Sequence, residues 1–185
     1  RSGASALRGW SRRFSIGEDS VGSAVNGGSN FFAFAGQGSQ HVGMWKDVFD
    51  TFACAREVFQ AVDERLQLSL SKLMFSGHEA DLNATSNAQP AIVAHSLALL
   101  AVLRQECGIE VAKHTTKAVL GHSLGEFTAF VAADALTLEA AVELVRLRGE
   151  EMQKCAPADG GKMVALFPVR SQEALDQIQA ACDLV

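Results

Sequence analysis

The residues with the clearest chemical potential form the pentapeptide Gly121-His122-Ser123-Leu124-Gly125, which fits the pattern Gly-x-Ser-x-Gly. Between a strand and a helix, this pattern places the serine on a sharp turn that raises its hydroxyl above the sheet. A side chain at either glycine would crowd the turn. The backbone N–H of Leu124, at the start of the helix, is free to face a developing oxyanion. The pattern therefore predicts Ser123 as the nucleophile of an acyl transfer or hydrolysis.

A serine hydroxyl is a weak nucleophile unless a base within hydrogen-bond reach removes its proton. His122 adjoins Ser123, but neighbouring side chains diverge at such a turn, so we expect His122 to support or line the pocket instead. The remaining histidines lie in no motif that assigns them the role: His41, His78, His95 and His114. The chain thus supplies a nucleophile without an evident base.

Short apolar runs around this turn predict the strands of a parallel sheet, over 31–35, 117–120 and 162–167. Helical periodicity is expected over 49–66, 71–75, 91–105, 125–133, 137–156 and 171–182. A parallel sheet with flanking helices makes the expected fold class α/β.

Two of the expected helices carry more detailed predictions. Pro90 is suited to the first turn of the helix over 91–105, which places Gln89 at its entry. Thr137 is expected to cap the following long helix. The inner face of that helix is predicted to comprise Ala140, Ala141, Leu144, Val145 and Met152.

Five segments resemble, in order and spacing, the malonyl-CoA:acyl carrier protein transacylases and the related acyltransferase domains of polyketide and fatty acid synthases. They are 34–40 (FAGQGSQ), 87–91 (NAQPA), 121–127 (GHSLGEF), 146–152 (RLRGEEM) and 160–163 (GGKM). The resemblance covers about 31–185. It implies a hydrolase-like acyltransferase core over 31–161 and the beginning of a ferredoxin-like subdomain over 162–185.

The activity implied by the resemblance is a two-step malonyl transfer in fatty acid synthesis. Malonyl passes from coenzyme A to Ser123 as an ester, and then to the phosphopantetheine thiol of an acyl carrier protein. By the same resemblance, the backbone N–H groups of Gln37 and Leu124 match those that form the family's oxyanion hole, and Gln89 matches a residue that lines the active site. Arg148 matches the arginine that pairs with the free malonyl carboxylate, which a planar guanidinium can grip with two parallel hydrogen bonds. No metal or redox cofactor is implied.

The sequence departs from the family pattern in ways that leave alternatives open. Asp134 stands where a glycine usually ends the helix, although aspartate tolerates a left-handed cap. The family's catalytic histidine is expected beyond Val185, so the chain alone is not expected to turn over. One alternative is an esterase, lipase or patatin-like hydrolase with the same serine turn and water as acceptor. The other is a non-catalytic relative that serves as a scaffold.

Composition argues against several other classes. A net charge of −5 and a pI near 5.5 offer no basic surface for nucleic acid or an anionic membrane. The richest apolar run, 92–103, is interrupted by His95 and Ser96, so membrane insertion is not expected. The four cysteines are far apart in the sequence and form no Cys-x-x-Cys pair, which argues against a metal site or disulfide framework.

The first thirty residues differ from the rest in composition. They hold arginines among small and hydroxyl residues, with no acid before Glu18, which is typical of a transit segment. This predicts the mitochondrial matrix as the location, with plastid or cytoplasm as alternatives. An arm without a targeting role is the other interpretation. The Gly, Ser and Asn stretch over 21–30 is expected to be a flexible linker.

Overall fold

The computed structural model describes residues 31–114, 118–155 and 171–182. They belong to two units, one ending at Cys155 and one beginning at Ala156, which are described separately. The predicted transit segment at 1–30 and the predicted strand at 162–167 lie outside the described residues. The described part is mostly helical around a parallel sheet of two strands, so this sheet is smaller than the parallel-sheet core expected.

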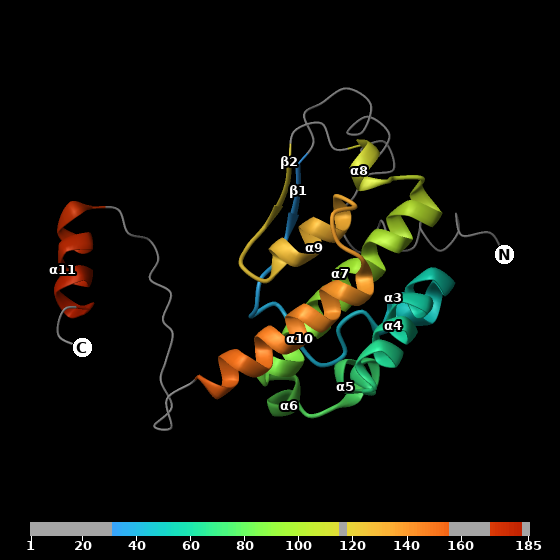
Figure 1. The fold of residues 1–185 in the computed structure, drawn as a ribbon, viewed down its shortest axis with the longest axis horizontal. Coiled ribbons are helices and arrows are strands. Elements are labelled where there is room, and N and C mark those ends of the chain that lie inside the picture. Colours follow the sequence, from blue (N-terminus) through green and yellow to red (C-terminus); the bar gives the residue numbers. More distant parts are fainter. Residues whose placement is uncertain (1–30, 115–117, 156–170, 183–185) are drawn as a thin grey trace. The chain divides into compact units, whose positions relative to one another are not determined.

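Within the described residues, the elements of the first unit follow one another as a strand, six helices, a second strand and two further helices (Figure 1). In chain order they are β1 (Phe31–Phe34), α3 (Lys46–Thr51), α4 (Ala53–Leu66), α5 (Leu70–Ser76), α6 (Glu79–Asn83), α7 (Thr85–Cys107), α8 (Val111–His114), β2 (Ala118–Gly121), α9 (Gly125–Ala132) and α10 (Leu138–Lys154). The second unit contributes α11 (Gln172–Cys182), which confirms the helix expected over 171–182.

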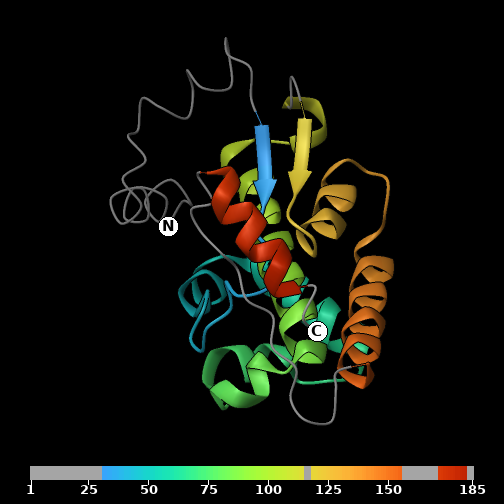
Figure 2. The same ribbon diagram turned by 90° about the vertical axis from the view of Figure 1, so that its left-hand side faces the viewer.

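The two strands lie side by side and run in the same direction (Figure 2). Phe31 pairs with Ala118 and Phe34 pairs with Gly121. The N–H of His122 extends the pairing by donating to the carbonyl of Phe34 at 3.1 Å. Parallel strands need a long connection, which α3 to α8 provide. Both strands end at the same edge of the sheet, so the loop after β1 and the turn after β2 are brought together.

The central helix of the core is α7, which packs against α4, α6, α9 and α10 (Figure 1). Its residues from Ala88 to Ala94 are all buried. By length and apolar composition α7 could also cross a membrane, which the interrupted run over 92–103 did not suggest. However, 61% of its most apolar window is buried within the protein, and the packed helices account for its apolar surface.

The start of α7 differs from prediction. The helix begins at Thr85, so Pro90 lies inside it and not in its first turn. An internal proline has no N–H for the carbonyl four residues earlier, which here belongs to Ser86. The structure supplies a substitute donor, because Nη1 of Arg146 bonds to the Ser86 carbonyl at 3.0 Å.

Other helix ends show where local patterns sufficed. The Thr137 hydroxyl accepts a hydrogen bond from the N–H of Ala140 at 3.2 Å, so the predicted cap of α10 is confirmed. Asp134 has φ 57°, as a left-handed cap requires.

The single helix predicted over 49–66 is wrong, because Phe52 adopts an extended backbone, is buried in the core and separates α3 from α4.

The predicted inner face of α10 is only partly right. Leu144 and Met152 are 45% and 42% exposed. The buried residues of the helix are Ala141, Val142, Val145 and Gly149. Gly149 sets this face, since it lies so close to α7 that a Cβ would come within 2.7 Å of the Thr85 carbonyl oxygen.

Candidate active site

Ser123 occupies the turn between β2 and α9, and its backbone has φ 50°. This left-handed conformation is rare for a residue other than glycine and is typical of strained functional turns. The flanking glycines are required by close approach. A Cβ at Gly121 would overlap the backbone nitrogen of Glu126, and one at Gly125 would overlap the carbonyl oxygen of Phe34. Ser123 itself is exposed and open to an acyl donor.

Arg148 reaches Ser123 from α10. Its Nη2 donates to Oγ of Ser123 at 3.1 Å, and its Nη1 donates to Oε1 of Gln89 at 2.7 Å. Gln89 is fully buried, and its Nε2 lies 3.3 Å from Sδ of Met152. A guanidinium is permanently charged and only donates hydrogen bonds. Arg148 therefore cannot take the serine proton, but it can hold an anion beside the serine.

Two backbone N–H groups of the site are unoccupied. Among the described residues, neither the N–H of Gln37 nor that of Leu124 donates to another group. Gln37 lies in the loop after β1, and its Nε2 donates to Oγ1 of Thr85 at 3.3 Å. In the same loop, Nε2 of Gln40 donates to Oδ1 of Asn83 at 2.8 Å. These bonds tie the loop that carries Gln37 to the beginning of α7 and to the end of α6.

No histidine in the described part of the chain bonds to the serine hydroxyl, whose one hydrogen-bond partner there is Arg148. The ring of His122 lies against Gly36, where a Cβ would come 2.5 Å from Nδ1. His95 lies on α7 as expected, and burial lowers its pKa to about 4. The side chain of His114 lies outside what the structure describes.

Two side chains near the site carried no prediction from the sequence. Thr85 anchors the loop after β1. Besides its bond to the Ser86 carbonyl, Nη1 of Arg146 donates to Oδ1 of Asn87 at 2.7 Å. Its Nε donates to Oε1 of Glu150 at 2.6 Å. The one signal for Arg146 in the sequence is its place two residues before Arg148 in the motif at 146–152.

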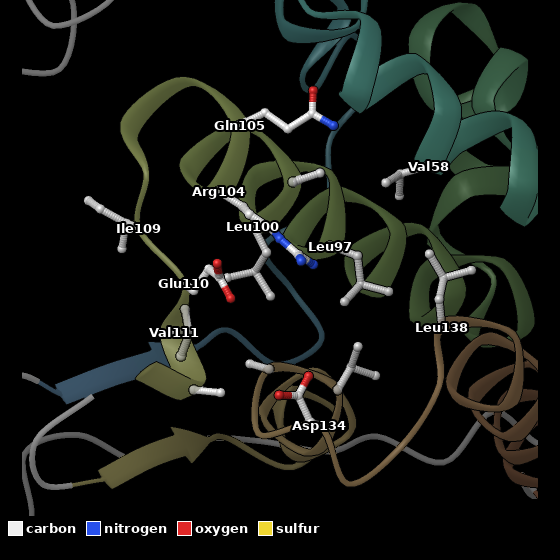
Figure 3. A pocket seen from close by; sticks show the side chains of 14 residues that line it. Val58, Leu97, Leu100, Arg104, Gln105, Ile109, Glu110, Val111, Asp134 and Leu138 are labelled. Atoms are coloured by element: carbon white, nitrogen blue, oxygen red, sulfur yellow. The ribbon is translucent and has the colours of Figure 1, made fainter. Parts of the chain in front are cut away.

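A separate pocket of about 350 Å³ is drawn in Figure 3. Its lining includes Val131 and Ala132, at the end of α9 away from Ser123. Apolar side chains such as Leu97 and Leu100 line it, together with Arg104 and Asp134. None of the predicted site residues borders it. The candidate active site is therefore the edge of the sheet at Ser123 and not this pocket.

Comparison with known proteins agrees with this geometry. The family described as acyl transferase domain matches residues 31–183. The malonyl CoA-acyl carrier protein transacylase of Bacillus subtilis (strain 168) is 43% identical over 147 residues, which cover 80% of this chain and 44% of that protein. The chain belongs to the malonyl-CoA:acyl carrier protein transacylase family. The resemblance carried by the five motifs is thereby confirmed.

Solved transacylase structures share the fold of this chain. FabD from Acinetobacter baumannii is 33% identical with a TM-score of 0.74, and the match covers 84% of this chain and 48% of that one. The transacylase from Streptococcus pneumoniae is 40% identical with a TM-score of 0.70, over 83% and 48% of the two chains. A further relative, 35% identical with a TM-score of 0.63 over 69% and 40% of the two chains, is a malonyl-transacylase in complex with a type II polyketide synthase acyl-carrier protein. The chain spans less than half the length of each of these transacylases.

Proposed function

We propose that Ser123 accepts a malonyl group from malonyl-CoA and passes it to the phosphopantetheine thiol of an acyl carrier protein in fatty acid synthesis. The observation that carries the proposal is the position of Arg148, whose guanidinium lies between Gln89 and the serine hydroxyl. A cation held beside a nucleophile suits an acyl group that ends in a carboxylate. The names of the transacylase relatives support the same two partners.

In the first half of the reaction, Oγ of Ser123 attacks the thioester carbonyl of malonyl-CoA while a base takes its proton. Negative charge develops on the carbonyl oxygen, where the N–H groups of Gln37 and Leu124 stabilise it. The carbon–sulfur bond then breaks, and the sulfur of coenzyme A leaves as a thiol by taking up the proton. The malonyl group remains as an ester of Ser123.

In the second half, the sulfur of the phosphopantetheine thiol attacks this ester and forms a second tetrahedral intermediate. The same two N–H groups stabilise its oxyanion. The carbon–oxygen bond breaks, the thiol proton returns through the base to Oγ of Ser123, and the carrier leaves as malonyl thioester. The covalent intermediate divides one difficult transfer into two easier ones.

Arg148 selects the acyl group in this scheme. A malonyl carboxylate can accept two parallel hydrogen bonds from the guanidinium, which offsets the loss of the bond from Arg148 to the serine. An acetyl group has no anion for this purpose. His122 lines the pocket, and the base is expected from a part of the protein outside the described residues. Delivery to the mitochondrial matrix by the segment at 1–30 belongs to the same proposal.

Radiolabelled malonyl-CoA with holo acyl carrier protein tests the proposal in the full-length protein. Label that moves to the carrier supports malonyl transfer. Label released as free malonate would instead indicate a hydrolase with water as acceptor. Absence of label on both protein and carrier would indicate a non-catalytic relative.

A further inference from the structure

Arg146 links α10 to the beginning of α7. Nη1 donates to the carbonyl of Ser86 at 3.0 Å and to Oδ1 of Asn87 at 2.7 Å, while Nε donates to Oε1 of Glu150 at 2.6 Å. The side chain of Arg146 is only 25% exposed, so these bonds are partly shielded from water.

The Ser86 carbonyl needs this bond because of Pro90. In an unbroken α-helix, the N–H of residue 90 would donate to the carbonyl of residue 86. Proline has no N–H, and its ring also pushes against that carbonyl. Arg146 therefore replaces the backbone donor that is missing where Pro90 interrupts the hydrogen bonds of α7.

This turn carries groups of the active site. Gln89 precedes Pro90, and its buried Oε1 accepts the bond that orients Arg148. Thr85, at the start of the same helix, holds the side chain of Gln37 in the loop after β1. The same loop has a second anchor on α6, where Gln40 bonds to Asn83, so a displacement of the turn would chiefly move the partner of the guanidinium.

Close packing of α10 against α7 restricts how far the two helices joined by Arg146 can move. A Cβ at Gly149 would lie 2.7 Å from the Thr85 carbonyl oxygen and 2.8 Å from Cα of Ser86. The backbones of α10 and α7 therefore touch at Gly149, the residue after Arg148, against the first two residues of α7. Small residues allow such approach, and little slack remains for the helices to slide.

We propose that Arg146 is a positioning residue for malonyl recognition: by replacing the donor that Pro90 lacks, it keeps Gln89 in place to orient Arg148 toward Ser123. The proposal rests on the proposed function for its effect on substrate choice. Arg146 has no hydrogen bond to Ser123, so it acts through Gln89 and Arg148 and not on the reacting atoms.

The test compares Arg146→Met with a matched control, Arg65→Met, in the full-length protein. Arg65 also ties α10 to another helix, through a 2.7 Å ion pair between its Nη2 and Oε2 of Glu143, but that pair is exposed and has no link to the site. Arg146→Met should lower kcat/KM for malonyl loading by about 10- to 100-fold, because a partly buried carbonyl and amide lose their donor. Acetyl loading should change by less than about threefold, and Arg65→Met should leave both rates unchanged within the same limit.

Restoring the backbone donor provides a rescue. In Arg146→Met combined with Pro90→Ala, the N–H of residue 90 can again donate to the Ser86 carbonyl. The malonyl-to-acetyl ratio should then recover at least partly. A mere loss of folded protein would lower the loading rates of malonyl and acetyl equally and would leave their ratio unchanged. Equal losses for malonyl and acetyl, or no recovery with Pro90→Ala, would overturn the proposal.

Amide hydrogen exchange separates this inference from the proposed function, because it needs no substrate. Amides over 86–92 should exchange faster in Arg146→Met than in Arg65→Met, with the difference reduced by Pro90→Ala. If the unmodified protein does not load malonyl, the proposed function fails while these amides still report on the turn. Unchanged exchange in Arg146→Met would reject the positioning role even in an active transacylase.

Discussion

The guanidinium of Arg148 donates a hydrogen bond to the hydroxyl of Ser123 over 3.1 Å, although 25 residues separate them in the sequence. β2 delivers the serine to the edge of the sheet, and α10 returns across α7 with the arginine. The fold itself therefore holds the cation beside the nucleophile. Such preorganisation reduces the ordering that binding must otherwise accomplish.

The first prediction concerns this arginine. Arg148→Ala in the full-length protein should weaken malonyl loading by about 2 to 5 kcal/mol in kcat/KM, the range for removing one side of a buried charge pair. Acetyl loading should be spared or improved. Arg148→Lys should rescue little, because an ammonium cannot reproduce the paired hydrogen bonds of a guanidinium. Steady-state loading rates with both acyl-CoA substrates provide the measurement.

The control for Arg148→Ala is Arg65→Ala, which removes the positive charge on α4 from its exposed ion pair with Glu143 on α10. It should change kcat/KM for malonyl and for acetyl loading by no more than about 1 kcal/mol each. If Arg148→Ala reduced malonyl and acetyl loading equally, Arg148 would have a structural role and no part in substrate choice.

The second prediction concerns the contact between α10 and α7. Gly149→Ala should lower the free energy of unfolding by about 1 to 3 kcal/mol, because the new Cβ would force the two backbones apart. Helix propensity alone predicts the opposite, since alanine favours a helix by about 1 kcal/mol over glycine. Denaturant unfolding distinguishes destabilisation by the clash from stabilisation by helix propensity. Glu151→Ala, at an exposed site on α10, should change stability by less than about 0.5 kcal/mol, and a stabilised Gly149→Ala protein would refute the tight contact.

Local signals predicted features, at the site and elsewhere, that depend on residues close in sequence. The turn at Ser123, the cap at Thr137 and the left-handed Asp134 each depend on a few neighbouring residues, so their patterns were sufficient. Arg148 and Gln89 were named only through resemblance to a family. Their mutual hydrogen bond joins residues 59 apart, which no local pattern reveals.

The early start of α7 shows why some predictions failed. Pro90 normally indicates a first turn, because an internal proline leaves a carbonyl without a donor. Here Arg146, 60 residues after Ser86, supplies that donor. A tertiary contact thus overrides the local preference, and only the three-dimensional structure shows it.

The third prediction concerns stability below neutral pH. Burial lowers the pKa of His95 from 6.5 to about 4, with the nearby charge of His41 as a smaller contribution. The unfolded chain therefore binds a proton below pH 6.5, while the folded chain resists it until about pH 4. The free energy of unfolding should fall across this window, by at most about 3 kcal/mol from this group.

The pH effect is isolated by comparing variants, because carboxylates titrate in the same range. In denaturant unfolding, the free energy of unfolding of His95→Leu should depend less on pH than that of the unmodified protein between pH 7 and about pH 4. His78→Gln, which changes an exposed histidine at the start of α6, should keep the original pH dependence. Identical pH profiles for His95→Leu and the unmodified protein would show that His95 does not resist protonation.

The most direct test of malonyl transfer through Ser123 is peptide mass spectrometry of the full-length protein after brief incubation with malonyl-CoA. The peptide that contains Ser123 should carry a malonyl ester, because an acyl-serine intermediate divides the reaction into two steps. Addition of holo acyl carrier protein should remove the ester, and Ser123→Ala should never acquire it. Malonyl found on Ser123→Ala protein, or on a residue other than Ser123, would contradict the assignment of this serine as the nucleophile.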